Sequence, residues 1–221
     1  MNCAREARRL ADYISALGGE ILLDSSVYYN CPNHIGALFT DIILQAGINY
    51  EYVVRPRVQR LVINYPEVDT RSKFQELIKN IGLENLISWR NKTKIYRIES
   101  LLNYAEINDI DTCYDLKLHL VKQANRLNLL DINGVGPKTL DYLLKLLGYD
   151  SVAVDRHIYS FIEMAEVNVR GYDAAKKIVE YAADFLEISR SSLDHSIWSY
   201  MANKNGALGN NILSQQLAIP F

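Results

Sequence analysis

Two residues in the second half of the chain, Lys138 and Asp155, could carry out nucleophilic chemistry together. The lysine would supply an amine as the nucleophile, and the aspartate would be its acidic partner. Lys138 follows the stretch Asn-Gly-Val-Gly-Pro at positions 133–137, and Asp155 lies 17 residues further along. The glycines permit a sharp turn and a close approach to another molecule, and Pro137 suits the first position of a helix. Lys138 would lie in the first turn of that helix, where the positive helix end disfavours its charged form. A partly neutral amine can attack an electrophilic carbon.

The same turn could also bind a phosphate group. The first N–H groups of a helix have no partner inside it and favour an anion. We expect the N–H groups of Gly134, Gly136 and Lys138 to face outward at this point. The alternative is an ordinary turn, with Lys138 as a solvated surface residue and Asp155 as the N-cap of the next helix. Spacing alone leaves both interpretations open.

Apolar residues recur with helical periodicity along nearly the whole chain, and strand-like alternation is nearly absent. The sequence therefore predicts an all-α fold of two helical lobes that meet at a cleft. Pro56 should bend or break the segment in which it lies. The helices are expected at residues 3–17, 36–46, 50–65, 70–80, 92–104, 114–127, 155–164, 172–186 and 192–203.

Composition limits the possible classes of protein. The chain has 221 residues, 49 % of them hydrophobic, which indicates a folded protein and not a disordered one. Its net charge of −2 argues against a bulk electrostatic binder of nucleic acid, so basic residues must gather on one face. No apolar run reaches the ~20 residues that a membrane span needs. The three cysteines, Cys3, Cys31 and Cys113, include no C-x-x-C pair, which disfavours a disulfide framework, a zinc finger or an iron–sulfur cluster.

Two stretches, residues 129–140 and 152–158, resemble the signature of the helix-hairpin-helix DNA glycosylase superfamily, which includes endonuclease III and the 8-oxoguanine glycosylases. The family pattern is Leu-x-Gly-Val-Gly-x-Lys followed by Val-Asp-x-His, and here Ile132-Asn133 replaces the usual Leu-Pro. The resemblance implies that Lys138 is a Schiff-base nucleophile and Asp155 its acid/base and charge stabiliser. It implies a bifunctional DNA glycosylase/AP lyase of base excision repair, which cleaves the strand by β-elimination.

The resemblance extends over residues 36–206 and implies the domain organisation. A central lobe of residues 36–150 would contain the helix-hairpin-helix, at about 127–148, beside the interlobe cleft. Residues 1–35 and 151–221 would form the second lobe. No cofactor is required, no iron–sulfur cluster or other metal centre is expected, and a monovalent cation on the hairpin carbonyl groups is the one ion that the family suggests.

Damaged double-stranded DNA is the partner that this resemblance implies. Gln45 would fill the gap that the extruded base leaves, or else it is a buried polar helix end. Arg90 and Lys92, with Arg55, Arg57, Arg60, Lys94 and Arg97, could contact phosphates, or they form solvated helix faces. Trp89 could stack on a base, although core packing is the alternative. The remaining expected DNA contacts are the hairpin residues Gly134, Val135, Gly136 and Thr139, and His157, which could instead support the start of the Asp155 helix.

The stretch Leu-Asp-His-Ser-Ile-Trp at positions 193–198 is similar to the compact archaeal-type 8-oxoguanine glycosylases. By that resemblance Asp194 and Trp198 lie in or beside the base pocket, and 8-oxoguanine is the expected substrate. The departure is the tail, residues 207–221, which lacks the terminal lysine of those enzymes. Oxidised pyrimidines, mismatched uracil or thymine, and a non-catalytic DNA-binding module are the alternatives. We expect a cytoplasmic, nucleoid-associated monomer with no membrane partner.

Overall fold

The computed structural model describes residues 2–23 and 31–206, and within them it is all-α, as the sequence predicts, with no strand. The chain forms two compact units. One unit contains residues 2–23 and 149–206, and the other contains residues 31–148. Residues 207–221, where the sequence departs from the compact 8-oxoguanine glycosylases, lie outside the described residues. None of the described helices combines the length and hydropathy needed to span a bilayer.

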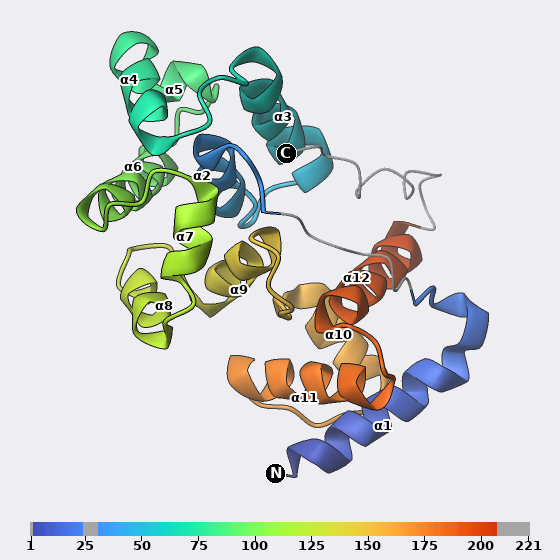
Figure 1. The fold of residues 1–221 in the computed structure, drawn as a ribbon. Helices are drawn as coiled ribbons and strands as arrows, with labels where there is room; N and C mark the ends of the chain where they lie inside the picture. The colour runs from blue at the N-terminus through green and yellow to red at the C-terminus, as the bar shows by residue number, and fades with distance from the viewer. Residues whose placement is uncertain (1, 24–30, 207–221) are drawn as a thin grey trace. The chain divides into compact units, whose positions relative to one another are not determined.

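The unit built from both ends of the chain consists of α1 (Cys3–Leu17), a short 3-10 turn η1 (Gly18–Glu20), α10 (Arg156–Met164), α11 (Tyr172–Phe185) and α12 (Arg190–Gly206). Helix α1 packs along α11, while α12 contacts both α10 and α11 (Figure 1). Its core contains Leu10, Phe161, Ile178 and Ile197, which are all fully buried.

The other unit is arranged around α2 (Ile35–Leu44), in which every residue is buried. Helix α2 contacts α3 (Arg55–Asn64), α4 (Arg71–Ile81), α6 (Lys92–Ile107) and α9 (Pro137–Leu146) (Figure 1). A helix that is buried on all sides must be surrounded by neighbours, and α2 therefore forms the axis of this unit. The remaining elements are η2 (Tyr50–Val54), α5 (Leu83–Leu86), α7 (Cys113–His119) and α8 (Gln123–Leu130).

Two expected helices differ from the structure. The segment expected at 114–127 is divided into α7 and α8, because the last carbonyl groups of α7 are capped by side chains of α8. Asn125 Nδ2 donates to the His119 carbonyl at 2.8 Å, and Arg126 Nε donates to the Leu120 carbonyl at 2.6 Å. The segment expected at 50–65 begins with the π-helical turn η2, and Pro56 lies in the first turn of α3, where its missing N–H removes no helical bond.

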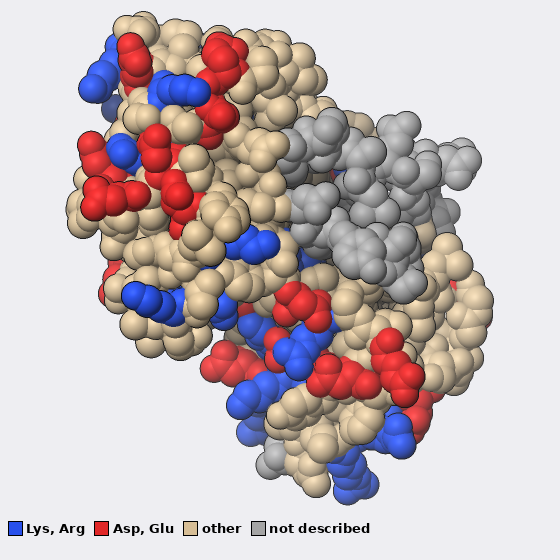
Figure 2. All heavy atoms as spheres, viewed as in Figure 1, with Lys and Arg blue, Asp and Glu red and all other residues tan. Residues whose placement is uncertain are grey.

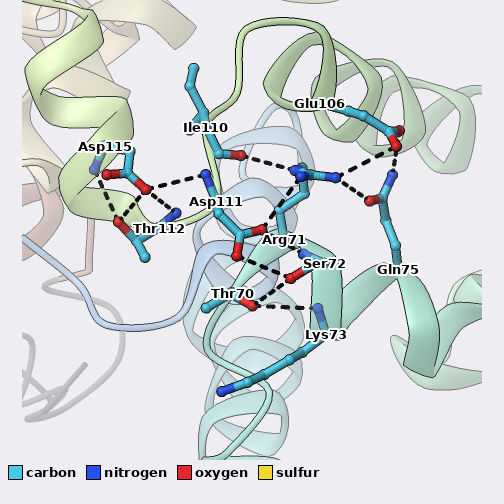
Figure 3. A network of polar contacts seen from close by, with 10 residues as sticks. All are labelled: Thr70, Arg71, Ser72, Lys73, Gln75, Glu106, Ile110, Asp111, Thr112 and Asp115. Carbon is cyan, nitrogen blue, oxygen red and sulfur yellow. Dashed lines mark hydrogen bonds and ion pairs between the residues drawn. The ribbon is translucent and has the colours of Figure 1, made fainter.

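A polar network fixes α4 against the loop between α6 and α7 (Figure 3). Arg71 donates to the Ile110 carbonyl at 2.9 Å and to Gln75 at 2.6 Å, and Asp111 accepts from the N–H and hydroxyl of Ser72. Asp115 and Thr112 form a capping box at the start of α7. These contacts hold together the side of the unit that carries α6, the helix on which Lys94 and Arg97 lie.

Candidate functional site

The turn between α8 and α9 is closed by two backbone hydrogen bonds, each between residues three positions apart. The N–H of Val135 donates to the Ile132 carbonyl at 2.9 Å, and the N–H of Ile132 donates to the Leu129 carbonyl at 3.2 Å. Gly134 has a φ of +90°, which side chains rarely adopt. The Leu129 and Ile132 carbonyl groups each accept one of these bonds, and the monovalent cation expected on the hairpin carbonyl groups stays a prediction.

Arg97 covers Gly134, a role that sequence reasoning missed. A Cβ atom on Gly134 would collide with the Arg97 side chain, and Arg97 Nη2 donates to Asn133 Oδ1 at 3.3 Å. Arg97 was expected among the phosphate contacts, but the structure uses its side chain to pack against the turn. The glycine is therefore required both by its backbone angle and by this close approach.

The start of α9 leaves N–H groups available. Gly136 is the N-cap and provides no side-chain cap. Among residues 2–23 and 31–206, no acceptor bonds the N–H of Gly134 or Gly136. A Cβ on Gly136 would meet nothing within 4 Å. Val135 and Thr139 are only 3 % and 7 % exposed, so these two expected DNA contacts have side chains that pack inward, and what they can offer a ligand at the surface is backbone.

The structure brings Lys138 and Gln45 together. Lys138 lies in the first turn of α9, and its Nζ donates to Gln45 Oε1 at 3.0 Å. Gln45 is the C-cap of α2, so the contact joins the N-terminal end of one helix to the C-terminal end of the other. Both side chains are half-buried. Two residues expected to act in the same site therefore lie within hydrogen-bond distance of each other.

Lys94 holds the turn that contains Gln45. Its Nζ donates to the carbonyl oxygens of Ile43, Leu44 and Ala46 at 2.9, 2.9 and 2.8 Å. A cation at a helix C-terminus satisfies carbonyl groups that have no partner within the helix. Burial, together with the positive charge of Arg97, lowers the pKa of Lys94 to about 8. For Lys94 the sequence left open a phosphate contact or a place on a solvated helix face, and the structure shows its amine on these carbonyl groups.

A buried carboxyl group lies one helical turn before Gln45. Asp41 is fully buried, and it accepts from the hydroxyl groups of Tyr50 at 3.0 Å and Tyr142 at 3.2 Å. Burial raises the pKa of Asp41 to about 7, although the two phenol hydrogen bonds and the charge of Arg55 oppose the rise. Nothing in the sequence distinguished this aspartate from a surface residue.

The basic residues of α3 are engaged locally. Arg55 pairs with Glu51 at 2.8 Å, and Arg60 donates to the Leu86 carbonyl at 2.7 Å. The guanidinium of Arg57 lies 5.2 Å from the centre of the Trp89 ring. Arg57 therefore covers the aromatic residue for which the sequence left base stacking and core packing open. Of the basic residues expected to contact phosphates, Arg90 and Lys92 are exposed. On the face drawn in Figure 2, basic and acidic side chains of the described residues are interspersed.

In the other unit, Asp155 is the N-cap of α10. Its Oδ1 accepts the N–H of His157 at 2.8 Å and of Ile158 at 3.1 Å. This is the structural role that the sequence offered as the alternative for Asp155. The His157 ring packs edge-on against Trp198, with ring centres 6.1 Å apart.

Asp194 and neighbouring residues of α12 hold the segment that leads to Asp155. Asp194 is 5 % exposed, and its Oδ2 accepts the N–H of Ala153 at 2.8 Å. Asp150 Oδ1 accepts the N–H of Ser191 at 2.8 Å, and Ser191 Oγ accepts the N–H of Ser151 at 3.2 Å. At least one oxygen of Asp194 therefore binds the backbone of the segment before Asp155. From the sequence, Asp194 was expected in or beside a base pocket, and this structural contact was not predicted.

Trp198 is half-buried between two histidines of its own unit. His195 stacks on it with ring centres 6.5 Å apart, and His157 meets its edge. Within the described residues, no group of three or more His, Cys, Asp or Glu side chains is arranged to hold a metal ion.

Comparison with known proteins gives a family without an assigned function. The family described as Domain of unknown function (DUF8548) matches residues 44–202, which is more than half of the chain. The matched range includes Gln45, the turn before Lys138, Asp155 and Trp198. No solved structure matches the chain.

Proposed function

The chain belongs to the DUF8548 family, and we propose that it is a DNA glycosylase with AP lyase activity that removes an oxidised base from duplex DNA. The first-choice substrate is 8-oxoguanine. The observation that carries the proposal is local: a lysine amine lies in the first turn of the helix that follows Gly134–Gly136, beside backbone N–H groups that have no acceptor among the described residues. A phosphate bound to those N–H groups would bring the sugar of a neighbouring nucleotide toward the amine.

The proposed reaction begins with an extruded nucleotide, since an enzyme cannot reach the target carbon inside the base stack. Lys138 Nζ attacks C1′, the bond from C1′ to the base breaks, and the base leaves with the bonding electrons and takes up a proton. The sugar ring then opens at the C1′–O4′ bond, which gives a Schiff base with Lys138. Loss of a proton from C2′ and departure of the 3′ phosphate cleave the strand.

Asp155 has two tasks in this proposal. Its carboxylate caps α10 through Oδ1 in the resting protein. By the resemblance, it would also act as the acid/base of the reaction and stabilise the positive charge that develops on the sugar. In the family that the sequence resembles, this is the part taken by the aspartate of the Val-Asp-x-His pattern, which here is Asp155.

The experiment that tests the proposal is trapping with borohydride, which reduces a Schiff base to a stable amine. Duplexes that each contain one 8-oxoguanine, one oxidised pyrimidine, one uracil or an abasic site are incubated with the protein and borohydride. We expect a covalent protein–DNA product with the 8-oxoguanine and abasic duplexes, and no such product with Lys138→Gln.

Lys79→Gln is the matched control, because Lys79 is an exposed lysine of α4 in the same unit as Lys138. It should trap DNA like the wild-type protein. Trapping with the pyrimidine or uracil duplex instead would keep the enzyme class and change the substrate. Binding of duplex without any trapping would reject the proposal in favour of a non-catalytic DNA-binding module.

A further inference from the structure

Two polar contacts, one helical turn apart, connect α2 and α9. Lys138 Nζ meets Gln45 Oε1 at 3.0 Å, and the Tyr142 hydroxyl meets Asp41 Oδ1 at 3.2 Å. In each helix the two residues are four positions apart, so they share one face and lie about 6 Å apart along the axis. The earlier residue of α2 meets the later residue of α9, and the helices are therefore antiparallel along this seam. The register of one contact fixes the register of the other.

Burying the Asp41 carboxyl group between two helices costs free energy of desolvation. Removing a carboxyl group from water is unfavourable, and well-packed apolar side chains at such a place are often as stabilising. Asp41 is nevertheless fully buried, and each of its oxygens has a phenol donor, because the Tyr50 hydroxyl meets Oδ2 at 3.0 Å. Directional hydrogen bonds specify how α9 lies on α2 more narrowly than apolar packing does.

We infer that Asp41 and Tyr142 are positioning residues for Lys138, and that their contact holds α9 in the register that places the Lys138 amine against Gln45. Lys94 also contributes, because its three carbonyl contacts fix the backbone around Gln45. The inference takes its chemical meaning from the proposed function, in which Lys138 is the nucleophile. The contact itself belongs to the 31–148 unit and can be measured without DNA.

The test measures the reactivity of the Lys138 amine in the free protein. Wild type, Tyr142→Phe and Asp41→Asn are treated briefly with acetic anhydride, and the acetylation of Lys138 relative to exposed Lys79 is quantified by mass spectrometry. Loss of a hydrogen bond that holds the seam should loosen Lys138 and raise this ratio by about 2- to 10-fold, the range that one net hydrogen bond supplies. Asn keeps a carbonyl oxygen that the Tyr142 hydroxyl can bond, so Asp41→Asn should raise the ratio less than Tyr142→Phe does. The double variant should resemble Tyr142→Phe, which alone removes the donor of this contact.

Tyr104→Phe is the matched control. The Tyr104 hydroxyl bonds to His119 Nε2 at 2.9 Å in the same unit but does not contact the α2–α9 seam. Its removal should leave the ratio unchanged, so a general loss of stability is separated from a loss of position. An unchanged ratio in Tyr142→Phe, with circular dichroism like that of wild type, overturns the inference, and so does an equal rise in Tyr104→Phe.

Trapping of abasic DNA supplies the second measurement. We expect Tyr142→Phe to slow single-turnover trapping at saturating DNA while its affinity for DNA stays the same. A wild-type protein that traps no DNA rejects the proposed function, yet the acetylation ratio still decides whether the contact positions Lys138. Normal trapping by wild type together with an unchanged ratio in Tyr142→Phe rejects the inference and leaves the proposed function in place.

Discussion

The amine of Lys138 donates a hydrogen bond to Gln45 Oε1 across 3.0 Å, although the two residues are 93 positions apart in the chain. The bond connects the first turn of α9 with the C-cap of α2. Any ligand that approaches the start of α9 therefore meets Lys138 with a neutral amide acceptor beside it.

Gln45→Glu changes the charge next to Lys138 with little change in shape. A carboxylate at this distance favours the ammonium form of the lysine, so the pH dependence of trapping should move to higher pH, and trapping at neutral pH should slow. Gln45→Leu provides the control, since it removes the acceptor without adding charge. Equal pH profiles for wild type and Gln45→Glu would show that Gln45 does not influence the reacting amine.

Gly136→Ala tests the turn as a phosphate site without disturbing the fold. Its new Cβ meets no atom within 4 Å, so the melting temperature should stay close to that of wild type. We expect weaker binding of damaged and undamaged duplex alike, because a methyl group would stand where a phosphate must approach the backbone. Fluorescence anisotropy measures both affinities.

Gly134→Ala is the contrasting variant. It forces a side chain into a φ of +90° and against Arg97, so it should lower stability by about 1 kcal/mol or more, whether or not DNA binds. Unchanged affinity in Gly136→Ala, with the fold intact by circular dichroism, would contradict the phosphate site. A Gly134→Ala protein as stable as wild type would contradict the described packing of Arg97.

Two substitutions separate the capping role of Asp155 from its proposed chemical role. Asn is as good an N-cap as Asp, so Asp155→Asn should keep the stability of α10, whereas Asp155→Ala should lose about 0.5–2 kcal/mol. Under the proposed function both variants lose the carboxylate and should slow single-turnover cleavage by roughly 10²–10⁴-fold. Near-normal cleavage by Asp155→Asn would remove Asp155 from the mechanism and leave it as a cap.

Asp41 should make stability depend on pH. Because its pKa is raised from 3.8 to about 7, its contribution is fully present below about pH 4 and is lost as the pH rises through 7. The free energy of unfolding should fall across that window with a slope of at most about 1.4 kcal/mol per pH unit from this group. Asp41→Asn should remove this part of the slope, as measured by urea unfolding at several pH values. A slope identical in wild type and Asp41→Asn would contradict the assignment.

Much of the local structure could be predicted from the sequence, because it depends on neighbouring residues. Periodicity indicated the all-α class and helices at 3–17 and 70–80. In the structure Gly18 ends the first of these with a φ of +52°, and Thr70 caps the start of the second. The division of residues 114–127 into two helices was missed, because it depends on Asn125 and Arg126 turning back to cap carbonyl groups of the preceding helix.

The candidate site divides in the same way. The turn before Lys138 is a local pattern of glycines and proline, and so it could be recognised from the chain alone. Tertiary structure decided which partners the basic residues contact. Lys94 binds carbonyl groups at the end of α2, about 50 positions earlier in the chain, and Arg97 covers Gly134. The identity of a charged residue in the sequence does not reveal whether its side chain faces water or caps a distant helix. Only the packing of α2, α6 and α9 determines which of these it does, and it is that packing which buries Asp41 and sets Lys138 beside Gln45.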